Sequence, residues 1–465
     1  MTDVFPRGWV IAFSFLAAVT TLAGVFFPDV LPSAALRILV AIQLALLASR
    51  LVSPKARPGL LNPLFLLPVV AYALFVIAPA CFATLPRPSF IMPEIHARYA
   101  SYFGSPAERI VLQFVSLCLL AGIYDPFARS AMPVRRDAVS ALLLRDRRRI
   151  GAAACAVAGG AAAIKLMDTK LGLLDAVPVP GAGGVVHDAL PPVIYFCLAA
   201  AIAIAQKGPP REWLLTGLWS ALCLFVLVSS DLARMPLAFA TFAILMIISL
   251  NGVHFRRAMM IGAITILVGA LSAVAAHSFR QLQAAPKTDF SESLVQSLSG
   301  KLMLRQAVSG WCLDRVVERH WDTTANSLPI GPVAGLVPRI LWPGKPAVSR
   351  GGEYAVEYCN AIVSKENPHS EALTLLAEPI MEGGKLGLFV GEALIILLLA
   401  VVAALMARFG TIAVAAGTAL LPWLTAFEQE LAFFVANSTK MFLFMLPFAI
   451  ALHLFARRKK DMAEA

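Results

Sequence analysis

The chain has 465 residues, of which 59% are hydrophobic and 14% are charged, and its formal net charge at pH 7 is +11. So few polar side chains cannot cover the surface of a water-soluble globule, and the mean hydropathy of +0.77 agrees with this. The composition therefore excludes a soluble enzyme and indicates an integral membrane protein.

Apolar runs that are long enough to cross a bilayer recur along the whole chain. A helix needs roughly 17 to 25 mainly apolar residues to span about 30 Å of hydrocarbon. Twelve runs meet this requirement and predict an all-α polytopic membrane protein. The predicted spans are 8–27, 34–50, 60–84, 109–124, 149–167, 189–206, 211–229, 235–253, 258–276, 386–407, 410–427 and 431–456. We expect the first span to be retained, because the second run follows it almost at once.

Basic residues are distributed unevenly among the loops between these runs. Lys and Arg are retained on the cytoplasmic side of short loops. The short loops on one side hold only four basic residues, namely Arg87, Arg98, Lys170 and Arg234, so that side is predicted to be the outer one and both termini are predicted to be cytoplasmic. This asymmetry accounts for the net charge, so it does not indicate nucleic-acid binding. The basic run 129–149 is expected to meet anionic lipid headgroups.

The large segment 277–385 is predicted to lie outside the cytoplasm. Its first part, 291–320, has apolar residues at mostly helical spacing and predicts one or two amphipathic helices that lie on the membrane or cap the bundle. Coil with many Pro and Gly residues follows Asn326, and a further helix is expected from His369 to about Ala377. The predicted domains are a nine-helix bundle over 1–276, the outer loop 277–385 and a three-helix bundle over 386–465.

The cysteines suggest packing rather than metal binding. Five of the seven lie in predicted spans, where a thiol is ordinary small apolar packing, and they lack metal-ligand spacing. Cys312 and Cys359 lie in the outer segment, where an oxidising compartment permits a disulfide. The sequence leaves their pairing open.

A rigid cationic loop lies late in the outer segment, at Pro338-Arg339-Ile340-Leu341-Trp342-Pro343-Gly344-Lys345-Pro346. Its three prolines restrict the backbone, while Arg339 and Lys345 carry fixed charge. This combination indicates a bound anion. The alternative is an ordered turn whose basic side chains face water.

The stretch 336–346, followed by Gly-Gly-Lys-Leu-Gly-Leu-Phe-Val-Gly at 383–391, resembles the Wzy-type O-antigen and exopolysaccharide repeat-unit polymerases. The stretch 367–373, with 376–378, is similar to the His-Asn segment of the related O-antigen ligases. Ser370 stands where Asn is common in that segment, which leaves the role of His369 open.

The resemblance implies a C-type glycosyltransferase that joins undecaprenyl-diphosphate-linked oligosaccharide repeat units at the periplasmic face of the bacterial inner membrane. It implies no cofactor. The implied partners are the lipid-linked glycan, membrane lipids, a chain-length regulator and a flippase. A ligase that transfers finished glycan, a transporter of lipid-linked oligosaccharide and a non-catalytic export factor are the alternatives.

The expected chemistry needs a base near the acceptor hydroxyl and cations around the leaving diphosphate. His369 is the first candidate for the base, with Glu371 and Glu378 as alternatives. The candidate diphosphate-binding residues are Arg339, Lys345, Arg280, Arg305 and Arg234. For Arg280 and Arg305 the alternative is a surface pair with Asp314, Glu318, Glu353 or Glu357.

Few charged residues lie within the predicted spans. Lys165 is expected to extend its amine to the membrane surface, and Lys440 to do the same or to pair with Glu428 or Glu430. No Asp-x-Asp pair or Cys/His ligand cluster occurs in the sequence, so a metal-independent reaction is expected.

Overall fold

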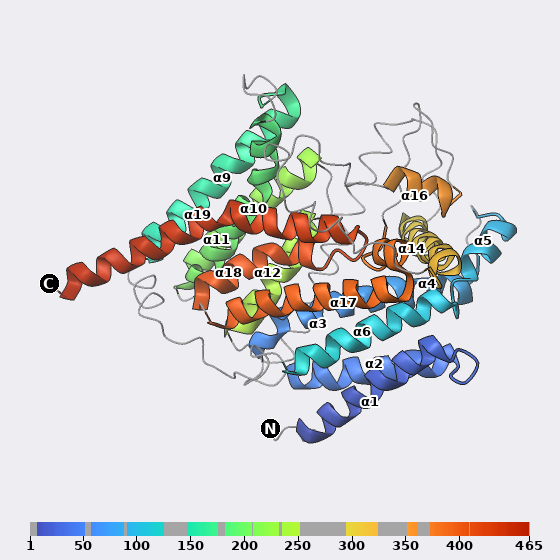
Figure 1. The fold of residues 1–465 in the computed structure, drawn as a ribbon. Coiled ribbons are helices and arrows are strands. Elements are labelled where there is room, and N and C mark those ends of the chain that lie inside the picture. Colours follow the sequence, from blue (N-terminus) through green and yellow to red (C-terminus); the bar gives the residue numbers. More distant parts are fainter. Residues whose placement is uncertain are drawn as a thin grey trace.

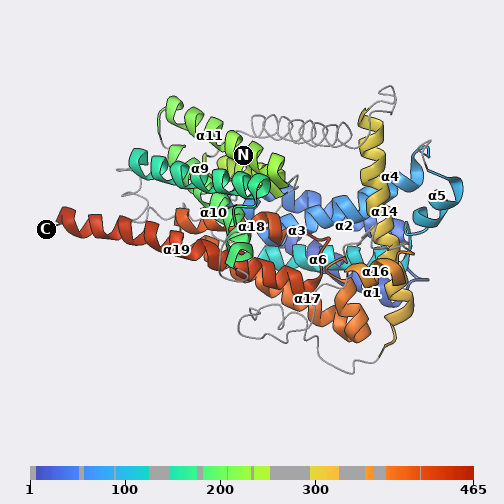
Figure 2. The ribbon, with the colours of Figure 1, turned by 90° about the horizontal axis from the view of Figure 1, so that it is seen from above.

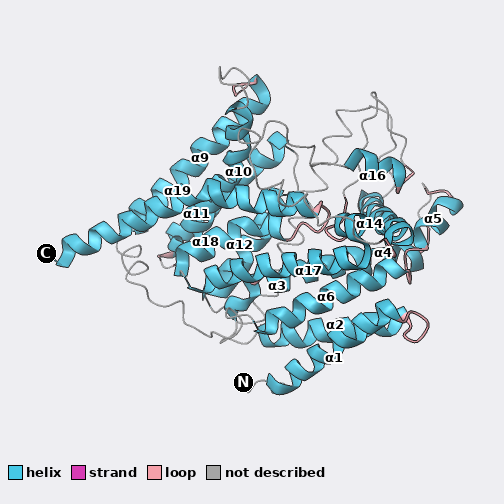
Figure 3. Ribbon diagram, in the orientation of Figure 1, coloured by secondary structure: helices cyan, strands magenta, loops and turns pink. Residues whose placement is uncertain are grey.

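The computed structural model describes residues 7–51, 57–87, 91–124, 147–174, 182–206, 208–231, 235–251, 294–323, 351–360, 373–408 and 410–464. Every regular element in this part of the chain is a helix, as Figure 3 shows. The helices are α1 (Arg7–Phe26), α2 (Ser33–Leu51), η1 (Arg57–Leu61), α3 (Pro63–Tyr72), η2 (Ala73–Ile77), α4 (Ala78–Thr84), α5 (Pro93–Ala100), α6 (Pro106–Tyr124), α9 (Arg147–Leu171), α10 (Ala182–Ala205), α11 (Pro210–Asp231), α12 (Met235–Asn251), α14 (Leu294–His320), α16 (Gly351–Glu357), α17 (Ala377–Arg408), α18 (Gly410–Leu424) and α19 (Leu431–Glu464).

Eight of the described helical stretches are long and apolar enough to cross a membrane, which identifies a multi-pass membrane protein. They are Gly8–Phe26, Ser33–Arg50, Pro63–Thr84, Pro106–Tyr124, Arg147–Thr169, Val185–Ala205, Ala377–Ala407 and Leu431–Leu452. Two further apolar helices, Met235–Leu250 and Gly410–Leu424, are shorter. The predicted span 211–229 lies in α11, which is not among the eight, and 258–276 lies outside the described residues. The number twelve therefore stays a prediction.

Local sequence explains where several helices begin. The side chain of Asn62 accepts a hydrogen bond from the N–H of Leu64 at 2.9 Å and so caps α3, whose first residue is Pro63. Proline also opens α5 and α6, at Pro93 and Pro106. Its fixed φ suits the first helical turn, where its missing N–H would have had no partner.

The helices pack into one bundle, in which α6 and α10 are the most enclosed of the eight candidate spans. Helix α6 contacts α1, α2 and α3, while α10 contacts α9, α18 and α19. Figures 1 and 2 show α5, α14 and α16 gathered at one end of the bundle, away from the C-terminus.

The predicted amphipathic segment 291–320 forms a single described helix, α14, which begins at Leu294 and ends at His320. It packs against α4, α5, α6 and α17, so it covers the end of the bundle. Its inner face is apolar, with Leu313 and Val316 fully buried. The prediction of an amphipathic helix that caps the bundle is confirmed.

A disulfide joins α14 to the turn that follows α16. Cys312 and Cys359 are bonded, with their Cα atoms 5.0 Å apart. The ring of His320 lies 2.8 Å from the hydroxyl oxygen of Tyr358 and adds a second link between these segments. The pairing that the sequence left open is thus formed. The cationic motif 338–346 falls between the two cysteines and lies outside the described residues.

The helix predicted from His369 to Ala377 is wrong over its described part. Residues 373–376 form coil and a turn, and α17 begins at Ala377. The N–H of Leu375 instead donates to the carbonyl oxygen of Phe427 at 3.0 Å, and the N–H of Ala377 donates to that of Thr374. A contact with a distant part of the chain has replaced the local helical hydrogen bonds.

Candidate functional site

The structure describes two of the site residues that the sequence predicted, Arg305 and Glu378. The other six lie outside the described residues: His369, Glu371, Arg339, Lys345, Arg280 and Arg234. The candidate site is therefore built from what surrounds Arg305 and Glu378.

A break in α17 positions Glu378. Gly384 has φ of 55° and ψ of −135°, which lies in a region that side chains with a Cβ rarely adopt. A Cβ at this position would lie 2.5 Å from the carbonyl oxygen of Thr323 and 2.9 Å from that of His320. Glycine is therefore required, because the chain turns here against the carboxyl end of α14.

The short helical piece before the break packs back against the long helix that follows it. A Cβ at Gly387 would overlap the carbonyl oxygen of Pro379, and one at Gly391 would lie 2.6 Å from the Pro379 ring. The glycine-rich motif 383–391 thus permits two close approaches, one to α14 and one to the segment 377–382. Its structural effect is to hold Glu378 inside the bundle.

Glu378 lies at the amino-terminal end of α19. Its side chain is 7% exposed, and its Oε2 accepts a hydrogen bond from the N–H of Ala432 at 2.9 Å. The N–H of Leu431 also donates to it. These amides and the helix dipole favour a negative charge at this position. Burial opposes that charge most strongly, and the nearby carboxyls of Glu382 and Glu430 oppose it further.

Arg305 reaches the same region from α14. Its guanidinium donates to Oε2 of Glu428 at 2.9 Å, and the amide of the neighbouring Gln306 also donates to Glu428. The alternative that the sequence offered for Arg305 was a surface ion pair, and an ion pair does form, but its partner is Glu428, 123 residues away, and not one of the four acids named. Of those acids, Glu318 pairs with Arg315 at 3.0 Å and Glu357 with Arg319 at 3.5 Å.

Two predicted site residues therefore converge on the α18–α19 turn, defined as residues 425–430 with the start of α19. Glu378 binds its end at Ala432, Arg305 binds Glu428, and the segment before α17 binds Phe427. The result is a group of four carboxyls and one guanidinium where helices end. The group consists of Glu378, Glu382, Glu428, Glu430 and Arg305. Such a group can accept a proton and bind a polar, charged ligand.

The two predictions for intramembrane lysines need correction. Lys165 was expected to extend to the membrane surface, but it is 2% exposed and its amine contacts the ring of His187. The other ring nitrogen of His187 lies 2.5 Å from the carboxylate of Asp168. The expected partner of Lys440 is also wrong, since its amine pairs with Asp188 of α10. Helix packing brings these groups together.

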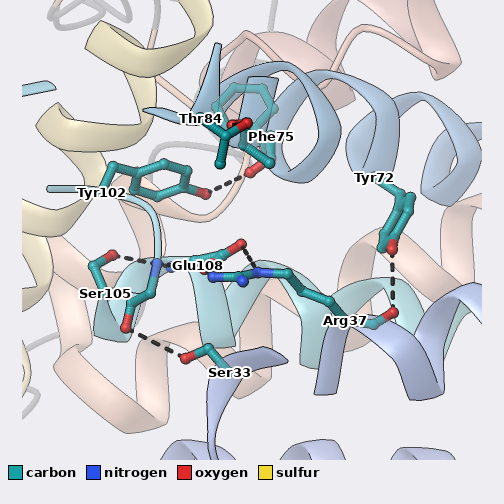
Figure 4. A network of polar contacts seen from close by, with 10 residues as sticks. Ser33, Arg37, Tyr72, Phe75, Thr84, Tyr102, Ser105 and Glu108 are labelled. Carbon is teal, nitrogen blue, oxygen red and sulfur yellow. Dashed lines mark hydrogen bonds and ion pairs between the residues drawn. The ribbon is translucent and has the colours of Figure 1, made fainter. Parts of the chain in front are cut away.

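A second polar network, which the sequence did not predict, joins α2 to α6 (Figure 4). The guanidinium of Arg37 donates two hydrogen bonds of 2.7 Å to the two carboxylate oxygens of Glu108. The N–H of Gly104 adds a third at 2.6 Å, and the Tyr72 hydroxyl donates to the carbonyl oxygen of Arg37. A charged Arg within a predicted span was the available signal. This pair is fully engaged, so it holds the helices together.

Asp314 links α14 to the start of α6. Its Oδ1 accepts a hydrogen bond from the N–H of Ala107 at 3.2 Å. Burial raises the pKa of the Asp314 carboxyl above its ordinary value, and the Ala107 hydrogen bond acts in the opposite direction. Helix α14 therefore contacts both polar regions, the α2–α6 network through Asp314 and the α18–α19 turn through Arg305.

Within the described residues, no group of three or more His, Cys, Asp or Glu side chains has a metal-binding arrangement. The metal-independent reaction stays a prediction. Comparison of the chain with family models, with curated proteins and with solved structures finds no match.

Proposed function

We propose that this protein is a glycosyltransferase that polymerises undecaprenyl-diphosphate-linked oligosaccharide repeat units at the periplasmic face of the bacterial inner membrane. The observation that carries the proposal is the convergence of Glu378 and Arg305 on the α18–α19 turn. A buried carboxylate and a cation are the two kinds of group that this reaction needs, and both contact the chain where α18 ends and α19 begins.

In the proposed reaction a hydroxyl of the acceptor sugar attacks the anomeric carbon of the lipid-linked donor. The bond between that carbon and the diphosphate oxygen breaks, and the diphosphate leaves with the electron pair. Glu378 takes the hydroxyl proton or orients the hydroxyl, with His369 and Glu371 as the other candidate bases. Arg305 and the predicted cations Arg339, Lys345, Arg280 and Arg234 stabilise the leaving diphosphate.

Two observations support a periplasmic site. The loops on the side opposite segment 277–385 hold most of the basic residues, which favours a cytoplasmic location for those loops. The disulfide between Cys312 and Cys359 is typical of an oxidising compartment. A reporter that is active only outside the cytoplasm should be active when fused after Ser327 and silent when fused after Arg136. The reverse result would exclude a periplasmic site.

The test of the reaction uses the full chain in lipid vesicles with purified undecaprenyl-diphosphate-linked repeat units. The wild-type protein should produce a ladder of polymers. Glu378→Gln keeps an oxygen that can accept from Ala432 but removes the base, so turnover should fall on the order of 100-fold or more. Glu318→Gln, on the exposed side of α14, is the matched control and should keep full turnover.

The products separate the possible outcomes. Transfer of a single glycan to a different acceptor would identify a ligase, and the absence of any transfer would exclude a glycosyltransferase. Full polymer formation by Glu378→Gln would remove Glu378 from the reaction and leave His369 and Glu371 as candidates.

A further inference from the structure

A buried pair of side chains joins α6 to α17 inside the membrane-spanning bundle. The side-chain amide of Gln113 donates to Oε2 of Glu392 at 2.9 Å. Glu392 is 2% exposed and Gln113 is fully buried. Glu392 lies about 12 Å beyond the break in α17, at 1.5 Å of rise per residue, and Gln113 lies near the middle of α6. The pair therefore lies within two candidate membrane spans, and it borders the candidate site, because Gly391 packs against the ring of Pro379.

The hydrogen bonds of this pair are incomplete if Glu392 is ionised. Oε1 of Glu392 and Oε1 of Gln113 are both buried and have no hydrogen-bond donor. An ionised carboxylate offers only acceptors, whereas a protonated one has an O–H donor. A single proton on Oε1 of Glu392 supplies the missing donor, and its natural acceptor is Oε1 of Gln113. The acid and the amide then form a ring with two hydrogen bonds.

The neighbouring pair on α6 shows what a complete contact looks like. The hydroxyl of Ser116 donates to Oε1 of Gln43 at 2.7 Å, and the amide of Gln43 donates to the carbonyl oxygen of Ser116 at 3.1 Å. Both polar ends of Gln43 are engaged, and no ionisable group takes part. Gln113 and Glu392 reach the same completeness only with an added proton.

The surroundings of Glu392 also favour the neutral form. No ion pair joins Glu392 to a cation among the described residues, whereas Glu108 binds Arg37 through both oxygens. The titratable side chain that interacts electrostatically with Glu392 is the thiol of Cys118, which is buried on α6. An uncompensated carboxylate in hydrocarbon is costly, and a bound proton removes that cost.

We propose that Glu392 and Gln113 form a proton-binding site in the membrane interior. Glu392 holds one proton from the solvent at neutral pH, and the resulting O–H donates a hydrogen bond to Oε1 of Gln113. The two hydrogen bonds of this pair fasten α17 to α6. Loss of the proton leaves a buried charge and two acceptors without donors, so it loosens the contact between the two helices. This inference does not depend on the proposed glycosyltransferase reaction.

Infrared spectroscopy of the purified full chain in lipid nanodiscs at pH 7 tests the site. We expect the carbonyl band of a protonated carboxylic acid, and we expect Glu392→Gln to remove the part of that band that Glu392 contributes. The control Glu318→Gln removes an exposed carboxylate and should leave the band unchanged. A wild-type spectrum without the band, or a band of full intensity in Glu392→Gln, would overturn the proposal.

Gln113→Leu tests whether Gln113 is the hydrogen-bond partner of Glu392, and it can be measured even if Glu392→Gln does not fold. Loss of the amide removes the acceptor of the proposed O–H, so the carbonyl band should persist at a shifted frequency. A band at the wild-type frequency in Gln113→Leu would show that Glu392 donates its proton elsewhere, and it would overturn the pairing.

Thermal unfolding against pH and salt distinguishes a proton from a metal ion. The folded chain holds a proton that the unfolded chain releases near neutrality, so wild-type stability should fall as pH rises. Glu392→Gln keeps a neutral partner for Gln113 and should show a smaller fall in stability near neutral pH than the wild type. A rise in the unfolding temperature of the wild type with Na⁺ or K⁺, absent in Glu392→Gln, would assign the two oxygens to a metal ion and overturn the proton site.

Discussion

Two buried carboxylates, Glu108 and Glu378, are held in different ways near helix α14. Glu108 binds the guanidinium of Arg37 through both oxygens and also accepts an N–H, so its charge is compensated. Glu378 accepts hydrogen bonds only from backbone amides and has carboxyls as neighbours, without an ion pair among the described residues. A carboxylate that is already paired stabilises the fold, whereas one held by amides keeps the capacity to take a proton or meet a cationic ligand.

The largest expected effect on stability belongs to the paired carboxylate. Arg37→Ala leaves Glu108 buried without its cation and should destabilise the protein by about 3–5 kcal/mol. Replacement of both residues, Arg37→Met with Glu108→Leu, should recover most of that loss, because no charge is then left unpaired. Thermal unfolding of the two variants checks this. If the double variant is as unstable as Arg37→Ala, the pair is not the source of the effect.

The disulfide should affect the surroundings of Glu378 more than those of Glu108. It fastens the turn after α16 to α14, and the end of α14 contacts Gly384. Cys312→Ser should cost about 2–4 kcal/mol under oxidising conditions. The same loss should appear in the wild type after reduction, and the reduced wild type and Cys312→Ser should then unfold together. Cys155→Ser, at a free cysteine, is the control and should not respond to reductant.

Gly384→Ala acts directly on the break that positions Glu378. The positive φ costs about 1–2 kcal/mol for a residue with a Cβ, and the added atom would meet the carbonyl oxygen of Thr323. We expect a loss of turnover larger than the loss of stability, since Glu378 shifts from the start of α19. Gly160→Ala, where a Cβ meets nothing within 4 Å, should affect neither property. Equal turnover in the two variants would contradict a role for the break.

The smallest expected effect on stability belongs to Asp314, which joins α14 to the start of α6 beside Glu108. Its raised pKa in the folded state means that its favourable contribution is present below the unfolded value of about 3.9 and is lost as pH rises through the folded value. Asp314→Asn should therefore gain stability relative to the wild type as pH rises above about 4, by less than about 1 kcal/mol. Parallel unfolding temperatures between pH 4 and 7 would contradict this.

Several features could be predicted from the sequence because they depend on local patterns. Apolar runs gave the positions of most described spans, and the periodicity of 291–320 gave α14. Glu378 and Arg305 were selected from their residue types and their place in the outer segment. The contacts of Arg37, Glu108 and Glu392 were missed, although a charge inside or beside a predicted span is itself a signal.

The sequence by itself determined that the chain is a helical, multi-pass membrane protein, because hydrophobicity and helical period are properties of neighbouring residues. Only the tertiary structure decided which polar groups meet. Glu378 reaches Ala432 because glycines let 377–382 fold back on α17, and Arg305 finds Glu428 across 123 residues. Such pairings depend on the rotation and depth of each helix in the bundle, which are set by packing between distant segments and not by any local pattern.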